Sequence, residues 1–291
     1  MGTKPLTVRE LSTPKKITWC PGCGNFAILT AVKRAIVELK IKPEDVLIVS
    51  GIGCHGKISD YINVNTFHTI HGRVIPFLAG AKIANHKLVA IGFAGDGDAY
   101  SIGWGHLTHA ARRNDDIVYI VHNNMVFGLT TGQYTPTSPR NFKSRSTPYG
   151  SIEEPLNPIL LSLASGSTFV ARAFSGDIQH LTMVIKEAIK HKGFAHVDVL
   201  QPCVTFYNTY QEFSKKIYKL EDSGHDPGNW DKAVEKAVEW PGSGDRIPIG
   251  IFYRNEERKP YTEMLSQIRD APLVFHKIES VDISPLLEES M

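Results

Sequence analysis

The sequence lacks long apolar runs. None of its apolar stretches approaches the roughly 20 residues that a membrane-spanning helix needs. Residues 1–16, MGTKPLTVRELSTPKK, also lack the apolar core of a secretory signal. We therefore expect no membrane segment and predict a cytoplasmic protein.

An excess of charge of either sign is also missing. The 32 Lys and Arg residues nearly balance the 30 Asp and Glu residues, which leaves a formal net charge of +2. The aromatic residues form no stripe with basic residues of the kind that binds nucleic acid. Nothing in this balance requires nucleic acid or an anionic membrane as a partner, and we expect neither.

Cysteine is scarce, with only Cys20, Cys23, Cys54 and Cys203 in the chain. Structural disulfides are rare in a reducing cytosol, so metal binding, redox chemistry and simple burial are the remaining roles. The first two cysteines form a CxxC pair in the stretch ITWCPGCGN. That pair alone is compatible with a metal site or with a redox switch.

What the sequence does contain is a regular alternation of helix and strand patterns. Residues 25–40 place apolar side chains at three- and four-residue steps after a possible N-cap at Asn25, which predicts an amphipathic helix. Further apolar strands are predicted near residues 45–51, 87–95, 116–124, 167–174 and 196–200, with helices near 99–113 and 178–190. Nearly all-apolar strands alternating with helices predict a doubly wound α/β fold with a mostly parallel sheet covered on both faces.

The alternation weakens after Phe206, which suggests a boundary there. We assign residues 1–206 to the α/β domain and residues 207–291 to a C-terminal extension that packs on the domain or on a partner. Within the domain, residues 128–158 are rich in Gly, Pro, Ser and Thr and predict a long loop. A loop of this length in a compact domain is usually functional or disordered.

Polar turns follow two of the predicted strands. GDGD begins at Gly95 and a pair of Asn residues begins at Asn123, so Asp96 and Asn124 should lie at the carboxyl edge of the sheet. Carboxylate and amide oxygens suit magnesium or calcium, and Gly95 and Gly97 allow the backbone to approach a phosphate. Either turn alone is common at a strand end, but the two together favour a metal and phosphate site.

This pair of turns resembles the thiamine-diphosphate motif, in which GDG and NN are separated by about thirty residues. The resemblance implies that magnesium is bound by Asp96, Asn124 and the backbone carbonyl of Val126. The residues expected around the cofactor are Gly53, Cys54, Gly95, Asp96, Gly97, Asp98, Asn124, Val126, Gly128, Leu129 and Thr130.

The resemblance extends to a particular family. WCPGCG, GIGC, HGR, GDGD, HAARRN, NN, GLTTGQYTPTS and QPCVTF occur in the order seen in the β subunits of 2-oxoacid:ferredoxin oxidoreductases. In that family the corresponding cysteines hold one 4Fe-4S cluster, which implies Cys20, Cys23, Cys54 and Cys203 as ligands. From the residues alone, four thiolates suit either such a cluster or zinc, and their spread over a large domain favours iron and sulfur.

The resemblance implies an enzyme that decarboxylates a 2-oxoacid oxidatively to an acyl-CoA and passes electrons through the cluster to ferredoxin. Its cofactors would be thiamine diphosphate, magnesium and one 4Fe-4S cluster. His71 and Lys57 are candidate catalytic residues, although a capping histidine and a solvated lysine are ordinary alternatives. We favour 2-oxoglutarate over pyruvate because Lys57 or a partner-chain Arg can meet a second carboxylate. His55 stands where the family more often has Ser, so its role is open.

Only the diphosphate-binding half of a thiamine enzyme is recognisable in the chain. We therefore predict a separate α subunit that supplies the pyrimidine domain, the Glu that activates the cofactor and most contacts with CoA, in an αβ or doubled αβ assembly. Candidate contacts for an acidic ferredoxin are Lys15, Lys16, Lys215, Lys216 and Lys219, which are otherwise ordinary surface lysines.

Two other functions are compatible with the same residues. One is a thiamine-dependent lyase or synthase without redox chemistry. The other is a non-catalytic scaffold subunit that binds metal through the four cysteines but binds no thiamine diphosphate.

Overall fold

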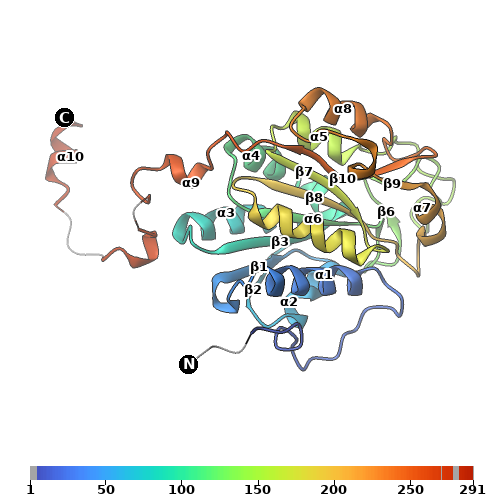
Figure 1. Cartoon of the computed structure of the whole chain (residues 1–291), viewed down its shortest axis with the longest axis horizontal. Helices are drawn as coiled ribbons and strands as arrows, with labels where there is room; N and C mark the ends of the chain where they lie inside the picture. Colours follow the sequence, from blue (N-terminus) through green and yellow to red (C-terminus); the bar gives the residue numbers. More distant parts are fainter. Residues whose placement is uncertain (1–4, 270, 278–281, 291) are drawn as a thin grey trace.

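A computed structural model describes residues 5–269, 271–277 and 282–290 of the chain. An eight-stranded sheet forms its centre, with the strand order β2-β1-β3-β4-β8-β7-β10-β9 (Figure 1). These strands are β1 (Val46–Ser50), β2 (Asn65–His68), β3 (Val89–Gly95), β4 (Val118–Asn123), β7 (Phe169–Phe174), β8 (Ala195–Leu200), β9 (Ile217–Lys219) and β10 (Ile247–Arg254). A separate two-stranded sheet pairs β5 (Val126–Phe127) with β6 (Gln133–Tyr134).

The first six strands of this order are parallel to their neighbours, and β10 pairs with β7 in the antiparallel direction. Every residue of β4, β7 and β8 is buried, as expected for strands covered on both faces. The predicted doubly wound, mostly parallel α/β fold is therefore confirmed.

Helices cover both faces of the sheet. On one face, α1 (Asn25–Glu38) and α6 (Ile178–Lys190) pack against each other and share an apolar core with Ile91 and Phe93 of β3. On the other face, α3 (Val74–Ala84) and α4 (Trp104–Arg113) share a core with Ala90 and Ala94 of the same strand. Alternate side chains of a strand point to opposite faces, so one short apolar run supplies both cores.

The N-cap predicted for the first helix is wrong by one residue. Gly24 occupies that position without a side-chain hydrogen bond, and Asn25 is the first helical residue. The Asn25 side chain is buried, and its Oδ1 lies 2.7 Å from Nδ1 of His122 on β4. A tertiary contact therefore uses the amide that local sequence assigned to capping.

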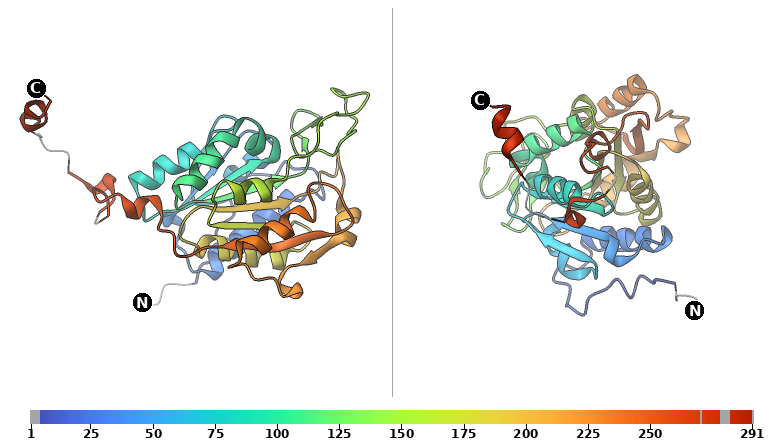
Figure 2. Two further views of the ribbon diagram at one scale, coloured as in Figure 1. Left: turned by 90° about the horizontal axis from the view of Figure 1, so that it is seen from above. Right: turned by 90° about the vertical axis from the view of Figure 1, so that its left-hand side faces the viewer.

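The C-terminal region is partly built into the same sheet through β9 and β10. Helices α5 (Pro158–Ala164) and α8 (Trp230–Val238) pack together over β7 and β10. The remaining helices are α2 (Ile58–Tyr61), α7 (Tyr210–Lys216), α9 (Tyr261–Met264) and α10 (Ser284–Glu288), and α10 extends away from the body (Figure 2). The division after residue 206 stays a prediction. None of the helices described is both long and apolar enough to cross a membrane.

Candidate active site

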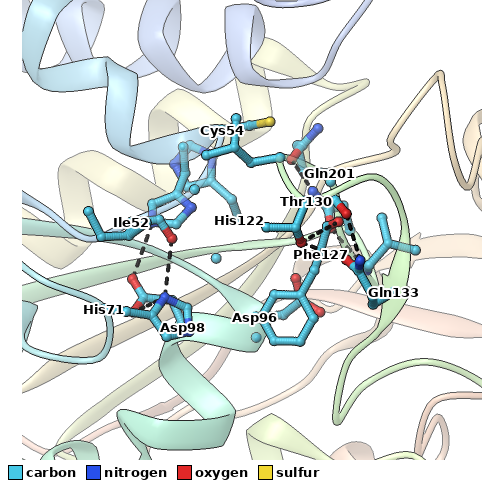
Figure 3. Close-up of a pocket in the computed structure, with 18 residues that line it drawn as sticks. Ile52, Cys54, His71, Asp96, Asp98, His122, Phe127, Thr130, Gln133 and Gln201 are labelled. Atoms are coloured by element: carbon cyan, nitrogen blue, oxygen red, sulfur yellow. Dashed lines mark hydrogen bonds and ion pairs between the residues drawn. The ribbon is translucent and has the colours of Figure 1, made fainter. Parts of the chain in front are cut away.

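The carboxyl ends of four neighbouring strands, β1, β3, β4 and β8, bring the predicted site residues together. A cavity of about 470 Å³ opens there (Figure 3). Among its lining residues are all those expected around the cofactor, together with His71: Gly53, Cys54, Gly95, Asp96, Gly97, Asp98, Asn124, Val126, Gly128, Leu129 and Thr130. Since β3 and β4 are parallel neighbours with Gly95 opposite His122, Asp96 and Asn124 follow at the same edge.

Asp96 is a buried carboxylate without a cationic partner among the described residues. Burial raises its pKa to about 6, although hydroxyl groups of Thr135 and Thr137 and nearby backbone N–H groups stabilise the charged form. Ionising such a group away from water is costly unless a counter-charge is present. A divalent cation would supply that counter-charge.

The neighbouring oxygen donors are held in place by hydrogen bonds. Asn124 Oδ1 accepts from the backbone N–H of Val126 at 3.1 Å, and its Nδ2 donates to Gln201 Oε1 at 3.2 Å. One carboxylate, one amide oxygen and one backbone carbonyl form the donor set that a magnesium ion prefers when phosphate and water complete its shell. Asp96, Asn124 and Val126 thus fit the predicted ion.

A network of buried hydrogen bonds orients the Asp96 carboxylate. Thr137 Oγ1 lies 2.8 Å from Asp96 Oδ2 and 2.9 Å from Asn123 Oδ1, and Asn123 Nδ2 donates to Asp198 Oδ1 at 3.0 Å. Asp198 is paired with the fully buried Arg172 at 3.4 Å. Thr137, Asn123 and Asp198 were not predicted from the sequence, because their meeting depends on the packing of the long loop against β4 and β8.

Asp98 is held between two histidines. Its Oδ1 lies 3.3 Å from His71 Nδ1, and its Oδ2 lies 3.2 Å from His55 Nε2. The backbone N–H of Gly72 also donates to this carboxylate. The geometry therefore gives Asp98 a direct role in orienting both rings beside the cavity, in addition to the cofactor contact predicted for it.

His122 is a lining residue that was not predicted from the sequence. Its ring lies 5.8 Å from that of His55, between centroids, and burial together with the nearby His55 holds its pKa well below the ordinary value. The imidazole is therefore neutral at physiological pH. Its place one residue before the Asn pair was the available signal, because that position lies near the carboxyl end of a buried strand.

Gly97 is required by packing. A Cβ at this position would lie 2.2 Å from Cε1 of Phe127, so the aromatic ring rests directly on the glycine. Phe127 lines the cavity together with Ile52, Gln133 and Gln201, none of which was predicted. Through this contact, the segment after the Asn123–Asn124 turn packs on the GDGD turn.

The four cysteines gather beside the cavity. A Cβ at Gly128 would lie 3.8 Å from the sulfurs of both Cys54 and Cys203. Burial raises the pKa of Cys23 to about 11, and the charges of Cys203, Cys54 and Cys20 contribute smaller parts of that rise. Within the described ranges, no three His, Cys, Asp or Glu side chains already form a metal site. The sulfurs are thus close enough to interact, although their arrangement is not that of a closed ligand shell.

Gln201 joins the two parts of the site. Its Oε1 accepts from Asn124, and its Nε2 lies 3.5 Å from Cys23 Sγ. The amide therefore contacts a predicted magnesium ligand and a predicted cluster ligand at once. Its place two residues before Cys203 gave no indication of this role.

Lys57 lies outside the cavity lining. Its Nζ donates to Thr18 Oγ1 at 3.1 Å, and its charge acts on the thiol of Cys54, whose pKa it lowers against the larger effect of burial. The side chain therefore faces the cysteines in this structure. Its catalytic role stays a prediction, as does that of His71.

Comparison with known proteins yields matches over almost the whole chain. Residues 51–199 match the thiamine pyrophosphate enzyme, C-terminal TPP binding domain. Residues 203–270 match the family formed by the C-terminal part of the pyruvate ferredoxin oxidoreductase beta chain.

Individual relatives are equally informative. A 2-oxoacid:ferredoxin oxidoreductase subunit beta from Sulfolobus is 47% identical over 87% of both chains. A 2-oxoglutarate synthase subunit KorB from Methanocaldococcus jannaschii is 42% identical over 86% of this chain and 92% of its own. The solved structure of a 2-oxoglutarate:ferredoxin oxidoreductase from Magnetococcus marinus, with 2-oxoglutarate, coenzyme A and succinyl-CoA bound, superposes with a TM-score of 0.89 at 34% identity, covering 98% of this chain and 96% of that one.

Proposed function

Because the chain belongs to the β subunits of the 2-oxoacid:ferredoxin oxidoreductases, we propose that it holds the diphosphate end of thiamine diphosphate and the electron-transferring cluster of such an enzyme. The observation that carries this proposal is the cavity at the carboxyl edge of the sheet. Asp96, Asn124 and Val126 meet there, and the cysteines gather beside it.

In this proposal, Asp96, Asn124 and the carbonyl of Val126 would hold magnesium, which would supply positive charge for the cofactor's diphosphate. Thiamine diphosphate, when bound, stabilises the carbanion chemistry needed to break the bond to the carboxyl group. The chain's own part is to fix that cofactor. The Asp96 carboxylate provides the negative charge that binds the cation. The turn at Gly97, which packs against the Phe127 ring, forms part of the cavity wall.

Electrons then leave one at a time. Conversion of a 2-oxoacid and CoA to acyl-CoA and CO2 releases one proton and two electrons, whereas a ferredoxin cluster accepts single electrons. Cys20, Cys23, Cys54 and Cys203 would hold the 4Fe-4S cluster that mediates this transfer. Their soft thiolates suit it. Gln201 contacts both Cys23 and the expected magnesium ligand Asn124.

We propose 2-oxoglutarate as the substrate and pyruvate as the next candidate. The support is the group of basic side chains near the cavity, because His55 and His71 line it and the charge of Lys57 acts on Cys54, another lining residue. A second carboxylate on the substrate would be drawn to such groups. Several relatives also carry a 2-oxoglutarate name.

A β subunit of this family works with an α subunit. We propose that the α subunit supplies the pyrimidine domain, the activating Glu and most contacts with CoA, in an αβ or doubled αβ assembly.

The proposal is tested with the complex of this chain and its α subunit, prepared without oxygen. Thiamine diphosphate, magnesium, CoA and a panel of 2-oxoacids are supplied, and reduction of methyl viologen is followed. Wild type should reduce viologen with 2-oxoglutarate, and Asp96→Ala should not. A complex that turns over no 2-oxoacid, or a β chain that turns over fully by itself, would contradict the proposal.

A further inference from the structure

The surface beside Cys20 differs from the remainder of the site. Cys20 is exposed, whereas Cys23, Cys54 and Cys203 are partly covered. Thr205 Oγ1 donates to the Cys20 sulfur at 3.3 Å, and the next residue, Phe206, is 41% exposed. If a redox group is held by these cysteines, this is the side on which it comes closest to solvent.

Phe206 opens onto a hollow of about 390 Å³, whose other lining residues include Phe142, Lys143 and Arg145. The Phe142 ring packs edge-on against Tyr207 at 5.1 Å between centroids, and Tyr207 is paired through its backbone with Cys203. The hollow is therefore continuous with the segment that carries Cys203 and contacts Cys20. We call this surface, made of Cys20, Thr205, Phe206, Lys143 and Arg145, the Cys20 face.

The charge of the Cys20 face is positive. Lys143 and Arg145 are both exposed, and neither makes an ion pair with any residue that the structure describes. Residues 128–152 contain no Asp or Glu, and Glu153 and Glu154 of the same loop form no ion pair with Lys143 or Arg145. Arg140 of the same loop differs, because it pairs with Glu154 at 2.8 Å.

Three of the five lysines predicted from the sequence as contacts for the electron carrier form ion pairs within this chain. Lys15 pairs with Asp60, Lys216 with Glu212 and Lys219 with Asp177. Lys143 and Arg145, which were not predicted from the sequence, line the hollow next to Phe206 and have no ion pair in the part of the chain described. Lys57, near Cys54, has none there either.

We infer that the Cys20 face is the docking surface for an acidic iron–sulfur electron carrier, an inference that rests on the proposed function. Two unpaired cations that share a hollow with an exposed aromatic ring fit a transient partner, because permanent interfaces are more hydrophobic. A cluster held by the four cysteines would give one electron to the oxidised carrier in each docking event, and no covalent bond would form or break. Two carriers dock in turn for each 2-oxoacid.

The test uses the complex with the α subunit and the double variant Lys143→Glu and Arg145→Glu. Binding of an acidic ferredoxin is measured by calorimetry at low and high salt, and turnover is measured with ferredoxin and with methyl viologen. We expect the Kd and the KM for ferredoxin to rise on the order of tenfold at low salt, since steering by opposite charge accelerates association by at least that factor. The salt dependence should flatten, and viologen reduction should not change.

Lys232→Glu with Lys259→Glu is the matched control, because both lysines lie at the surface and outside the Cys20 face. This control should behave as wild type. The milder pair Lys143→Gln and Arg145→Gln should give a smaller shift in the same direction, and it serves if the charge reversal impairs folding.

Three results would overturn the inference. The first is unchanged ferredoxin binding in both variants of the Cys20 face. The second is a raised KM for CoA with an unchanged KM for ferredoxin, which would make the hollow a phosphate site. The third is loss of the complex on gel filtration, which would make it a contact with the α subunit. A wild-type complex that binds ferredoxin but reduces no viologen would instead count against the proposed function.

Discussion

Replacing Thr137 by Val tests whether the buried network orients the metal ligand. Valine has nearly the shape of threonine, so the change removes the hydroxyl that lies 2.8 Å from Asp96 Oδ2 and 2.9 Å from Asn123 Oδ1 without emptying the site. Because one hydroxyl carries one proton, it donates to one of these oxygens at a time. Thr137→Val therefore leaves the buried oxygens of Asp96 and Asn123 with one hydrogen-bond donor fewer.

The size of the effect follows from the contacts that remain. A hydrogen bond to a charged group contributes roughly 1.5–3 kcal/mol. Thr135 also bonds to Asp96 and lies 3.3 Å from the Thr137 hydroxyl, so it compensates in part, and the lower value applies. About 1.4 kcal/mol corresponds to a factor of ten in an equilibrium constant. We expect thiamine diphosphate with magnesium to bind about tenfold more weakly.

The measurement is a calorimetric titration of thiamine diphosphate and magnesium into the assembled complex. Thr137→Ser keeps the hydroxyl and serves as the control, which should bind within about twofold of wild type. The thermal midpoint of the unliganded complex reports separately on folding. Wild-type affinity in Thr137→Val would refute the reasoning, and so would equal losses in Val and Ser.

Four further predictions address the remaining parts of the site. Cys20→Ser should remove the visible iron–sulfur absorption and electron transfer to ferredoxin, while calorimetry still detects thiamine diphosphate. Asp96→Asn should abolish that binding yet stabilise the unliganded chain at pH 7, because the raised pKa of about 6 makes ionised Asp96 destabilising. The gain in the free energy of unfolding should be roughly 3 kcal/mol, because the pKa of Asp96 lies about two above its ordinary value. Measured by denaturant unfolding, this gain should shrink as the pH falls through 6 and be absent below about 4. Asp98→Asn should lower kcat for the 2-oxoacid more than cofactor affinity, since it loosens two histidines rather than a metal ligand; equal losses in both would contradict this. Gly97→Ala should destabilise the fold by about 1–3 kcal/mol, because its Cβ would lie 2.2 Å from Phe127, and Phe127→Leu should restore part of the loss.

The sequence predicted the α/β fold and part of the cavity lining, but not Ile52, His122, Phe127, Gln133 or Gln201. Apolar runs predicted the buried strands, and polar turns directly after them predicted Asp96 and Asn124 at one edge. Such inferences succeed because a parallel sheet carries every strand's carboxyl end to the same side. Residues next to a strand end can then be located without knowing how distant segments pack.

Only the tertiary structure decided which side chains form hydrogen bonds and ion pairs with the residues at that edge of the sheet. Thr137 reaches Asp96 from a long loop, Gln201 links Asn124 with Cys23, and Asp98 is shared by His55 and His71. The capping amide expected at Asn25 is used instead by His122. Hydrogen bonds between segments far apart in the chain depend on side-chain positions within about 3 Å, and helical or strand periodicity carries no information at that scale. The same limit explains why Lys143 and Arg145, which line the hollow next to Phe206, were not among the lysines that the sequence suggested.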